Sequence, residues 1–204
     1  MEKIGLEQLR ENLIRDIFSG SLPGGSWLKQ ADLERRYGVS RALVRRVLDD
    51  LTVRDYVQHE PNRGYRVAIL SDDNRNELRE IRVVLECHAA ASVMECVTPA
   101  DVDELATLAE AFRQATQTGT LADQVTANFA FHQRLYEVGR NRTLFDLLME
   151  MHHRAVARVV TPWPSVAQME RAANDHFSMV EALKNGDLAA LQETIRRHVG
   201  HLGK

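Results

Sequence analysis

The sequence of 204 residues predicts a mostly α-helical protein in two parts. Apolar residues recur at helical spacing along most of the chain, and two short β-type runs lie together near residue 60. A polar stretch, SDDNRNEL, then separates regions of different charge balance. Residues 1–70 carry 12 Lys and Arg against 10 Asp and Glu, whereas residues 71–204 carry 14 against 19. We therefore expect one domain over residues 1–70 and a second over residues 71–204.

The composition is that of an ordinary globular protein, with 44% hydrophobic and 27% charged residues. The N-terminal segment lacks the apolar core of a signal peptide, and no apolar run approaches the roughly 20 residues that a membrane span needs. Cys87 and Cys96 are too few for a disulfide framework, so we expect reduced thiols in or near the core. Together these features predict a cytoplasmic protein.

The first part predicts three helices followed by a β-hairpin. Helices are expected over residues 6–20, 30–37 and 41–54, with Gly38 suited to the left-handed turn after the second and Ser40 placed to cap the third. The Gly/Pro/Ser cluster SGSLPGGS ends the first helix, and the runs YVQHE and YRVAI flank a tight turn, PNRG. This order of elements is typical of a winged helix-turn-helix.

The second part shows only helical periodicity and predicts an antiparallel bundle of about six helices. Asp72 or Asp73 could cap the first, a long helix over about residues 74–95. The sequences VTPAD, TGT, GRN, TPWP and NGD supply turn or cap chemistry between the others. Those helices are expected over residues 99–118, 121–138, 142–160, 165–184 and 187–201.

The third predicted helix carries arginines suited to reading DNA. Arg41, Arg45 and Arg46 lie off its apolar stripe, and Arg41 and Arg45 are one turn apart at the N-terminal end. That end enters the major groove in a helix-turn-helix, where an arginine can bond O6 and N7 of guanine. Ser40 and the adjacent backbone N–H groups can hold a phosphate. The helix is therefore a candidate recognition helix.

A solvated helix face is the alternative interpretation of these arginines. The positions of Asp49 and Asp50 argue against it. Acidic residues at the C-terminal end of a helix and basic residues at its N-terminal end both oppose the helix dipole and cost stability. An arrangement that costs stability suggests that the arginines are there for function. Arg63, at the predicted hairpin tip, can reach the minor groove or the DNA backbone. The inward stripe of the same helix consists of Leu43, Val44, Val47, Leu48 and Leu51.

The segment GVSRALVRRVLDDL, followed by NRGYRV, resembles the winged-helix domain of GntR-family bacterial transcription regulators over about residues 8–68. The resemblance implies that Ser40, Arg41 and Arg45 contact bases or phosphates and that Arg63 and Gly64 belong to the wing. One departure is Ala31, in QADLE, where many members have an arginine. An operator sequence is therefore not transferable from relatives.

Three predicted helices of the second part each direct a histidine toward a packed interior. His132 lies on an apolar face with Asn128 one turn before it, and His176 and His198 lie on the apolar stripes of the last two helices. Hydrogen-bonded core histidines are the alternative, but three unsatisfied buried imidazoles would cost roughly 1–3 kcal/mol each. One divalent metal satisfies all three, with the Asn128 amide as a fourth ligand. Such a ligand set favours Zn²⁺, Ni²⁺ or a similar ion.

Residues 74–201 resemble the FCD effector domain of the FadR subfamily, and six helices are typical of its smaller, VanR-like subgroup. The resemblance implies one divalent transition metal per chain, bound by Asn128, His132, His176 and His198. Asn128 departs from the family's Asp. The site is thus one negative charge short, and its metal affinity should fall or depend on an anionic effector.

Arg82, in REIRVVLE, matches an arginine of the family's R-x-x-L-E motif and implies a contact to the effector, a small carboxylate metabolite. The alternative is a salt bridge to Glu86, one turn further along. His152, His153 and His201 are expected at the surface or a boundary, although His152 or His153 could line the cavity.

The resulting hypothesis is a homodimeric transcription regulator, not an enzyme, and we expect repression. Each winged helix would read half of a near-palindromic operator in double-stranded DNA, and residues 70–76 would transmit effector binding. One alternative is a constitutive DNA-binding protein with a structural bundle. Another is a metal-dependent hydrolase, for which the sequence offers no obvious catalytic acid apart from Asp175.

Overall fold

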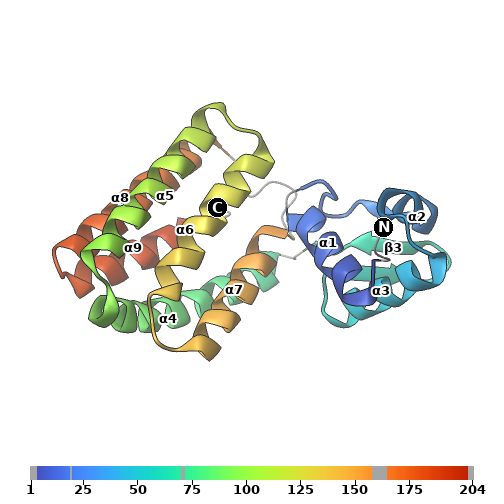
Figure 1. Ribbon diagram of the computed structural model, residues 1–204, viewed down its shortest axis with the longest axis horizontal. Helices are drawn as coiled ribbons and strands as arrows, with labels where there is room; N and C mark the ends of the chain where they lie inside the picture. Colours follow the sequence, from blue (N-terminus) through green and yellow to red (C-terminus); the bar gives the residue numbers. More distant parts are fainter. Residues whose placement is uncertain (1–3, 19, 70–71, 158–164, 202–204) are drawn as a thin grey trace. The chain divides into compact units, whose positions relative to one another are not determined.

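The computed structural model describes residues 4–18, 20–69, 72–157 and 165–201. Residues 1–70 group into one compact unit, and most of residues 71–204 group into a second. Helices dominate both units (Figure 1), which confirms the predicted fold class. Each unit has its own hydrophobic core.

The first unit is a winged helix-turn-helix. Its helices are α1 (Leu6–Phe18), α2 (Gln30–Tyr37) and α3 (Arg41–Val53). Its strands are β1 (Trp27–Leu28), β2 (Val57–Glu60) and β3 (Gly64–Val67), which form an antiparallel sheet in the order β1-β3-β2. The sequence predicted the β2–β3 hairpin but not β1, because two residues are too few to show an alternating pattern.

Local sequence signals position α3. Gly38 ends α2 with a φ of 65°, in the left-handed region that glycine tolerates. Ser40 then caps α3, and its Oγ accepts a hydrogen bond from the Leu43 N–H at 3.4 Å. The core stripe of α3 is fully buried at Val44, Val47, Leu48 and Leu51, and Leu43 packs against it. The opposite face of α3 is therefore left for solvent or a partner.

The second unit contains six helices in its described residues, as predicted. They are α4 (Asp72–Cys96), α5 (Pro99–Thr118), α6 (Leu121–Glu137), α7 (Arg142–Ala157), α8 (Val166–Lys184) and α9 (Leu188–His201). Helix α4 packs on α9, α5 packs on both α6 and α8, and α8 packs on α9. The core of this unit includes the buried residues Leu105, Phe131, Leu148, Met179 and Ile195, which come from α5, α6, α7, α8 and α9.

The observed helix ends differ slightly from the predicted ones. Helix α4 begins at Asp72, so neither Asp72 nor Asp73 stands before the helix as a cap, which corrects that prediction. Residues 72–76, the larger part of the predicted hinge, form its first turns, whereas residues 70–71 lie outside the described residues. The last three residues predicted for α7, 158–160, also lie outside them.

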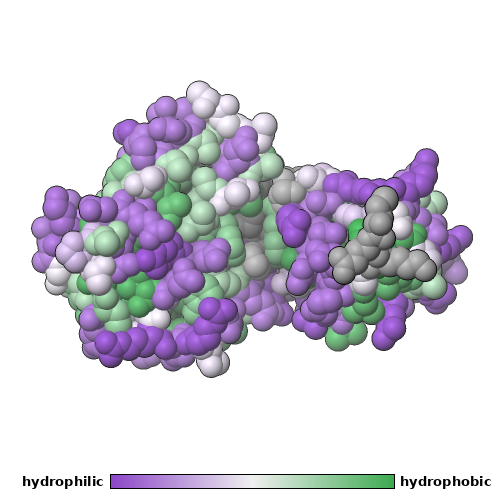
Figure 2. Space-filling model, viewed as in Figure 1, coloured by the Kyte–Doolittle hydropathy of each residue, from purple (hydrophilic) through white to green (hydrophobic). Residues whose placement is uncertain are grey.

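Hydrophilic residues cover much of the visible surface of each unit, with apolar residues gathered in smaller areas (Figure 2). Among the described residues, no helix combines the length and apolarity needed to cross a bilayer. Cys87 is buried, Cys96 is partly buried, and both are free thiols, as predicted.

Candidate functional site: a buried histidine cluster and an arginine-bearing helix

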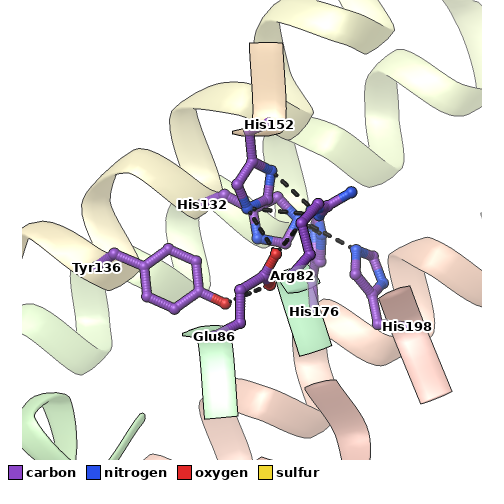
Figure 3. A network of polar contacts seen from close by, with 7 residues as sticks. All are labelled: Arg82, Glu86, His132, Tyr136, His152, His176 and His198. Atoms are coloured by element: carbon purple, nitrogen blue, oxygen red, sulfur yellow. Dashed lines mark hydrogen bonds and ion pairs between the residues drawn. The ribbon is translucent and has the colours of Figure 1, made fainter. Parts of the chain in front are cut away.

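Three histidines from three helices converge inside the second unit (Figure 3). His132 of α6 lies between the other two: its Nε2 is 3.1 Å from Nε2 of His198 on α9 and 3.3 Å from Nε2 of His176 on α8. The three residues are at most 1% exposed. Their ligand atoms all lie within 4.8 Å of one another, which is close enough for one metal ion.

The chemistry of these nitrogens fits a cation. Burial, reinforced by the neighbouring imidazoles, holds the pKa of both His132 and His176 well below the ordinary value, so these rings are neutral. The three Nδ1 atoms are buried without a hydrogen-bond partner, and the Nε2 atoms face one another. Ligands at about 2.0–2.1 Å from a tetrahedral ion lie about 3.3 Å apart, close to the observed spacings. The two short Nε2–Nε2 distances at His132 therefore fit nitrogens that share one metal ion.

Asn128 is also buried, one turn before His132 on α6. One helical turn brings its side chain to the same face as His132, and its role as a fourth, oxygen ligand stays a prediction. An amide brings no negative charge, so the four predicted ligands are neutral as a set.

A second polar network adjoins the histidines (Figure 3). The Glu86 carboxylate accepts hydrogen bonds from Arg82 Nε at 2.8 Å and from the Tyr136 hydroxyl at 2.6 Å, and His152 Nε2 lies 3.1 Å from it. Burial raises the pKa of Glu86, but the Arg82 guanidinium and His152 outweigh it and hold the carboxyl well below its usual range. The salt bridge between Arg82 and Glu86 is therefore present, and Arg82 is 3% exposed.

His152 is the residue that sequence reasoning misplaced. The expected surface or boundary position is wrong, because His152 is 2% exposed and its ring centroid lies 4.5 Å from that of His132. The alternative, that His152 lines the interior beside the cluster, agrees with this position. With Glu86 and His132 it forms a second group of possible metal-ligating atoms. The available signal was helical spacing, since Phe145, Leu148 and His152 fall on one stripe of α7. The side chains of His153 and His201 lie outside the described residues.

The low pKa values of the histidines predict acid sensitivity of the metal-free protein. Below about pH 6.5 the unfolded chain protonates these rings while the folded cluster does not, so stability falls as the pH decreases. Both His132 and His176 should contribute to this fall in the free energy of unfolding with decreasing pH. Urea unfolding of chelator-treated protein at pH 7.5, 6.0 and 5.0 measures this. The slope should shrink in His176→Gln, and an equal slope in that variant would contradict the assignment.

The first unit presents the predicted DNA-contacting residues on one helix and one turn. Arg41, Arg45 and Arg46 are exposed on α3, and Arg41 Nε donates a hydrogen bond to Gln30 Oε1 at 3.2 Å. Tyr65 of β3 donates to Asp49 Oδ1 at 2.5 Å and thereby ties the wing to α3. The three guanidinium groups therefore lie on the solvent-exposed side of α3, and the opposite side of this helix packs in the hydrophobic core.

The wing turn holds the remaining two predicted residues. Gly64 has a φ of 99°, a conformation that side chains rarely adopt. The Arg63 side chain is 72% exposed, lies 3.5 Å from Glu60 and stands over the Trp27 ring at 5.7 Å. Trp27, which sequence reasoning did not single out, is itself 44% exposed on β1. The wing thus presents a cation beside an aromatic ring.

These features define a class: a winged helix-turn-helix module joined to a helical domain with a buried histidine cluster. Residues 6–67 match the family described as bacterial regulatory proteins, gntR family, and residues 77–201 match the FCD domain. The chain belongs to the GntR family of bacterial regulatory proteins and carries an FCD domain. Its family and relatives are transcription regulators, not enzymes, which removes the hydrolase alternative.

Relatives of known sequence align with nearly the whole chain. It is 24% identical to the uncharacterized HTH-type transcriptional regulator YdhC of Bacillus subtilis, over 95% of this chain and 87% of that protein. It is 22% identical to a probable D-xylose utilization operon transcriptional repressor of Paenarthrobacter nicotinovorans, over 94% and 84%. It is also 22% identical to the HTH-type transcriptional repressor RspR of Escherichia coli, over 97% and 87%.

Solved structures share the fold. Escherichia coli McbR/YncC superposes with a TM-score of 0.83 at 22% identity, covering 98% of this chain and 95% of that one. A putative GntR transcriptional regulator from Rhodococcus sp. RHA1 gives a TM-score of 0.80 at 21% identity, covering 96% and 93%.

Proposed function

We propose that this protein is a homodimeric transcription repressor whose operator affinity is set by a small carboxylate bound beside a metal in the FCD domain. Residues 1–70 would bind DNA and residues 71–204 would sense the acid. The observation that carries the proposal is the meeting of His132, His176 and His198 in one buried cluster. Repression is supported by two relatives named as repressors.

The exposed arginines of α3 support operator binding. Arg41 and Arg45 are exposed at the N-terminal end of α3, the end with which a recognition helix would meet base edges, and Arg46 and Arg63 would add positive charge for the DNA backbone. Ser40 already caps α3, so its further contribution would be to align the first N–H groups toward a phosphate. A two-fold dimer would place two such helices on a near-palindromic site.

The histidine cluster supports a metal such as Zn²⁺ or Ni²⁺, one per chain, with Asn128 as the fourth protein ligand. When bound, the metal supplies a Lewis-acidic centre that a carboxylate can complete. Arg82 remains buried beside the cluster, where its Nη2 lies 3.3 Å from His152 Nδ1. Because Glu86 neutralises the charge of Arg82, Arg82 would bind the carboxylate effector mainly through hydrogen bonds.

Regulation requires that the acid binds one DNA-binding state of the dimer better than another. Helix α4 is the proposed transmitter, because it carries Arg82 and Glu86 and its first turn follows the joint with the DNA-binding unit. A coupling of about 1.4 kcal/mol would change operator affinity tenfold.

The test is a fluorescence-anisotropy titration of the metal-loaded protein against its own upstream DNA, with a panel of small mono-, di- and tricarboxylates. We expect at least one acid to raise the operator Kd tenfold or more, and removal of the metal with a chelator to abolish that response. A protein that binds the DNA tightly while no acid or chelator changes its Kd would instead be a constitutive DNA-binding protein.

A further inference from the structure

Asp175, which precedes His176 on α8, lies behind the histidine cluster and is 5% exposed. Its two carboxylate oxygens face two consecutive residues of α9. Oδ2 is 3.6 Å from Nδ1 of His198, while Oδ1 accepts hydrogen bonds from Arg197 Nε at 2.8 Å and Nη2 at 2.6 Å. The carboxylate therefore stands directly against the far side of a predicted metal ligand.

At 3.6 Å the Oδ2–Nδ1 contact is longer than a hydrogen bond, but the negative charge beside Nδ1 favours one tautomer of His198. A carboxylate only accepts hydrogen bonds, so the ring nitrogen beside it is favoured as the N–H nitrogen. Nε2 of His198 is then left with its lone pair, and it faces His132 Nε2 at 3.1 Å. A carboxylate behind a ligating histidine is a recurrent arrangement at metal sites, where it orients the ring and raises its basicity.

Charge gives Asp175 a second role. With Asn128 in place of a carboxylate, the predicted ligands bring no negative charge to a buried divalent ion. Among the described residues, Glu86 is also a buried carboxylate near the cluster, but the buried Arg82 already neutralises it. Arg197, the cation paired with Asp175, has a side chain that is 45% exposed, so water screens it more strongly.

We propose that Asp175 is the positioning residue of the metal centre: it fixes His198 with its proton on Nδ1 and supplies the negative charge that the four ligands lack. The inference rests on the metal centre of the proposed function. It adds an outer carboxylate to the residues that the sequence had indicated.

The test compares the metal affinity of wild-type protein, Asp175→Asn and a matched control, Glu170→Gln, which removes an exposed carboxylate from the same helix. Competition with a chromogenic chelator gives the Kd for Zn²⁺, and the visible absorption of bound Co²⁺ reports ligand geometry. We expect Asp175→Asn to bind about 10- to 100-fold more weakly with an altered Co²⁺ spectrum. Glu170→Gln should match the wild type.

A second variant, Arg197→Gln, separates this role from a structural ion pair between α8 and α9. It frees the carboxylate from its cation, so Zn²⁺ affinity should stay within threefold of the wild type or increase. Weaker binding in Arg197→Gln to the same degree as in Asp175→Asn would overturn the proposal, as would unchanged affinity in Asp175→Asn. Wild-type protein that binds no metal would instead remove the metal centre itself and this inference with it.

Discussion

Replacement of both Arg41 and Arg45 by alanine is expected to weaken operator binding on the order of 100-fold or more. Each arginine lies toward the N-terminal end of α3, where a bidentate contact to guanine would contribute about 1–3 kcal/mol of discrimination. Both side chains are exposed, and the buried face of α3 is formed by other residues. The double variant should therefore fold normally. Anisotropy titrations against specific and scrambled duplexes measure the loss.

The control for charge is a second double variant, Arg54→Ala with Arg196→Ala. Arg54 follows the trailing end of α3 and Arg196 lies on α9, so this variant loses the same two charges away from the recognition end. It should keep the ratio of specific to non-specific affinity, whereas the Arg41/Arg45 variant should lose most of it. Equal behaviour of the two double variants would exclude base reading by α3.

Replacement of His132 by glutamine is expected to reduce bound metal from about one ion per chain to a small fraction. His132 is the central member of the cluster, because both short Nε2–Nε2 distances include it. The two remaining imidazoles can still contact one ion. Without the third nitrogen, however, one coordination position is left open, so the site should hold the ion only weakly. Elemental analysis after equilibrium dialysis, and the shift of the melting temperature on adding Zn²⁺, measure the effect.

The matched control is His88→Gln, a histidine exposed on α4 of the same unit. It should retain metal and show the wild-type thermal shift, which for an ion at 100 times its Kd corresponds to about 2.7 kcal/mol. Stoichiometric metal in purified His132→Gln would place the ion elsewhere in the chain.

Local signals explain why much of the fold was predictable. The stripe of α3, the turn at Gly38 and the cap at Ser40 are all set by residues within a few positions of one another. The same holds for α5 and α6, whose capping boxes at Thr98 and Thr120 are visible as Thr followed by Asp three residues later. Strand β1 was not predicted, because it has no local sequence signal and forms only by pairing with β3.

The histidine cluster was predictable in part for the same reason. Helical phase alone places His132, His176 and His198 on inward faces, and the structure brings them together. The network around Glu86 required more, since Tyr136 and His152 lie 50 and 66 positions away from it in the sequence and meet it only through packing of α4, α6 and α7. Asp175 was noted as an acid beside a histidine, but its contact is with His198 on the next helix.

The most direct test of the account is the operator Kd of metal-supplemented wild-type protein and His132→Gln, each measured with and without the carboxylate that gives the largest response. We predict that the acid weakens DNA binding by the wild type at least tenfold and leaves His132→Gln, which still binds the operator, unchanged. Equal weakening in both proteins would contradict the account, because the acid would then act without the imidazole cluster.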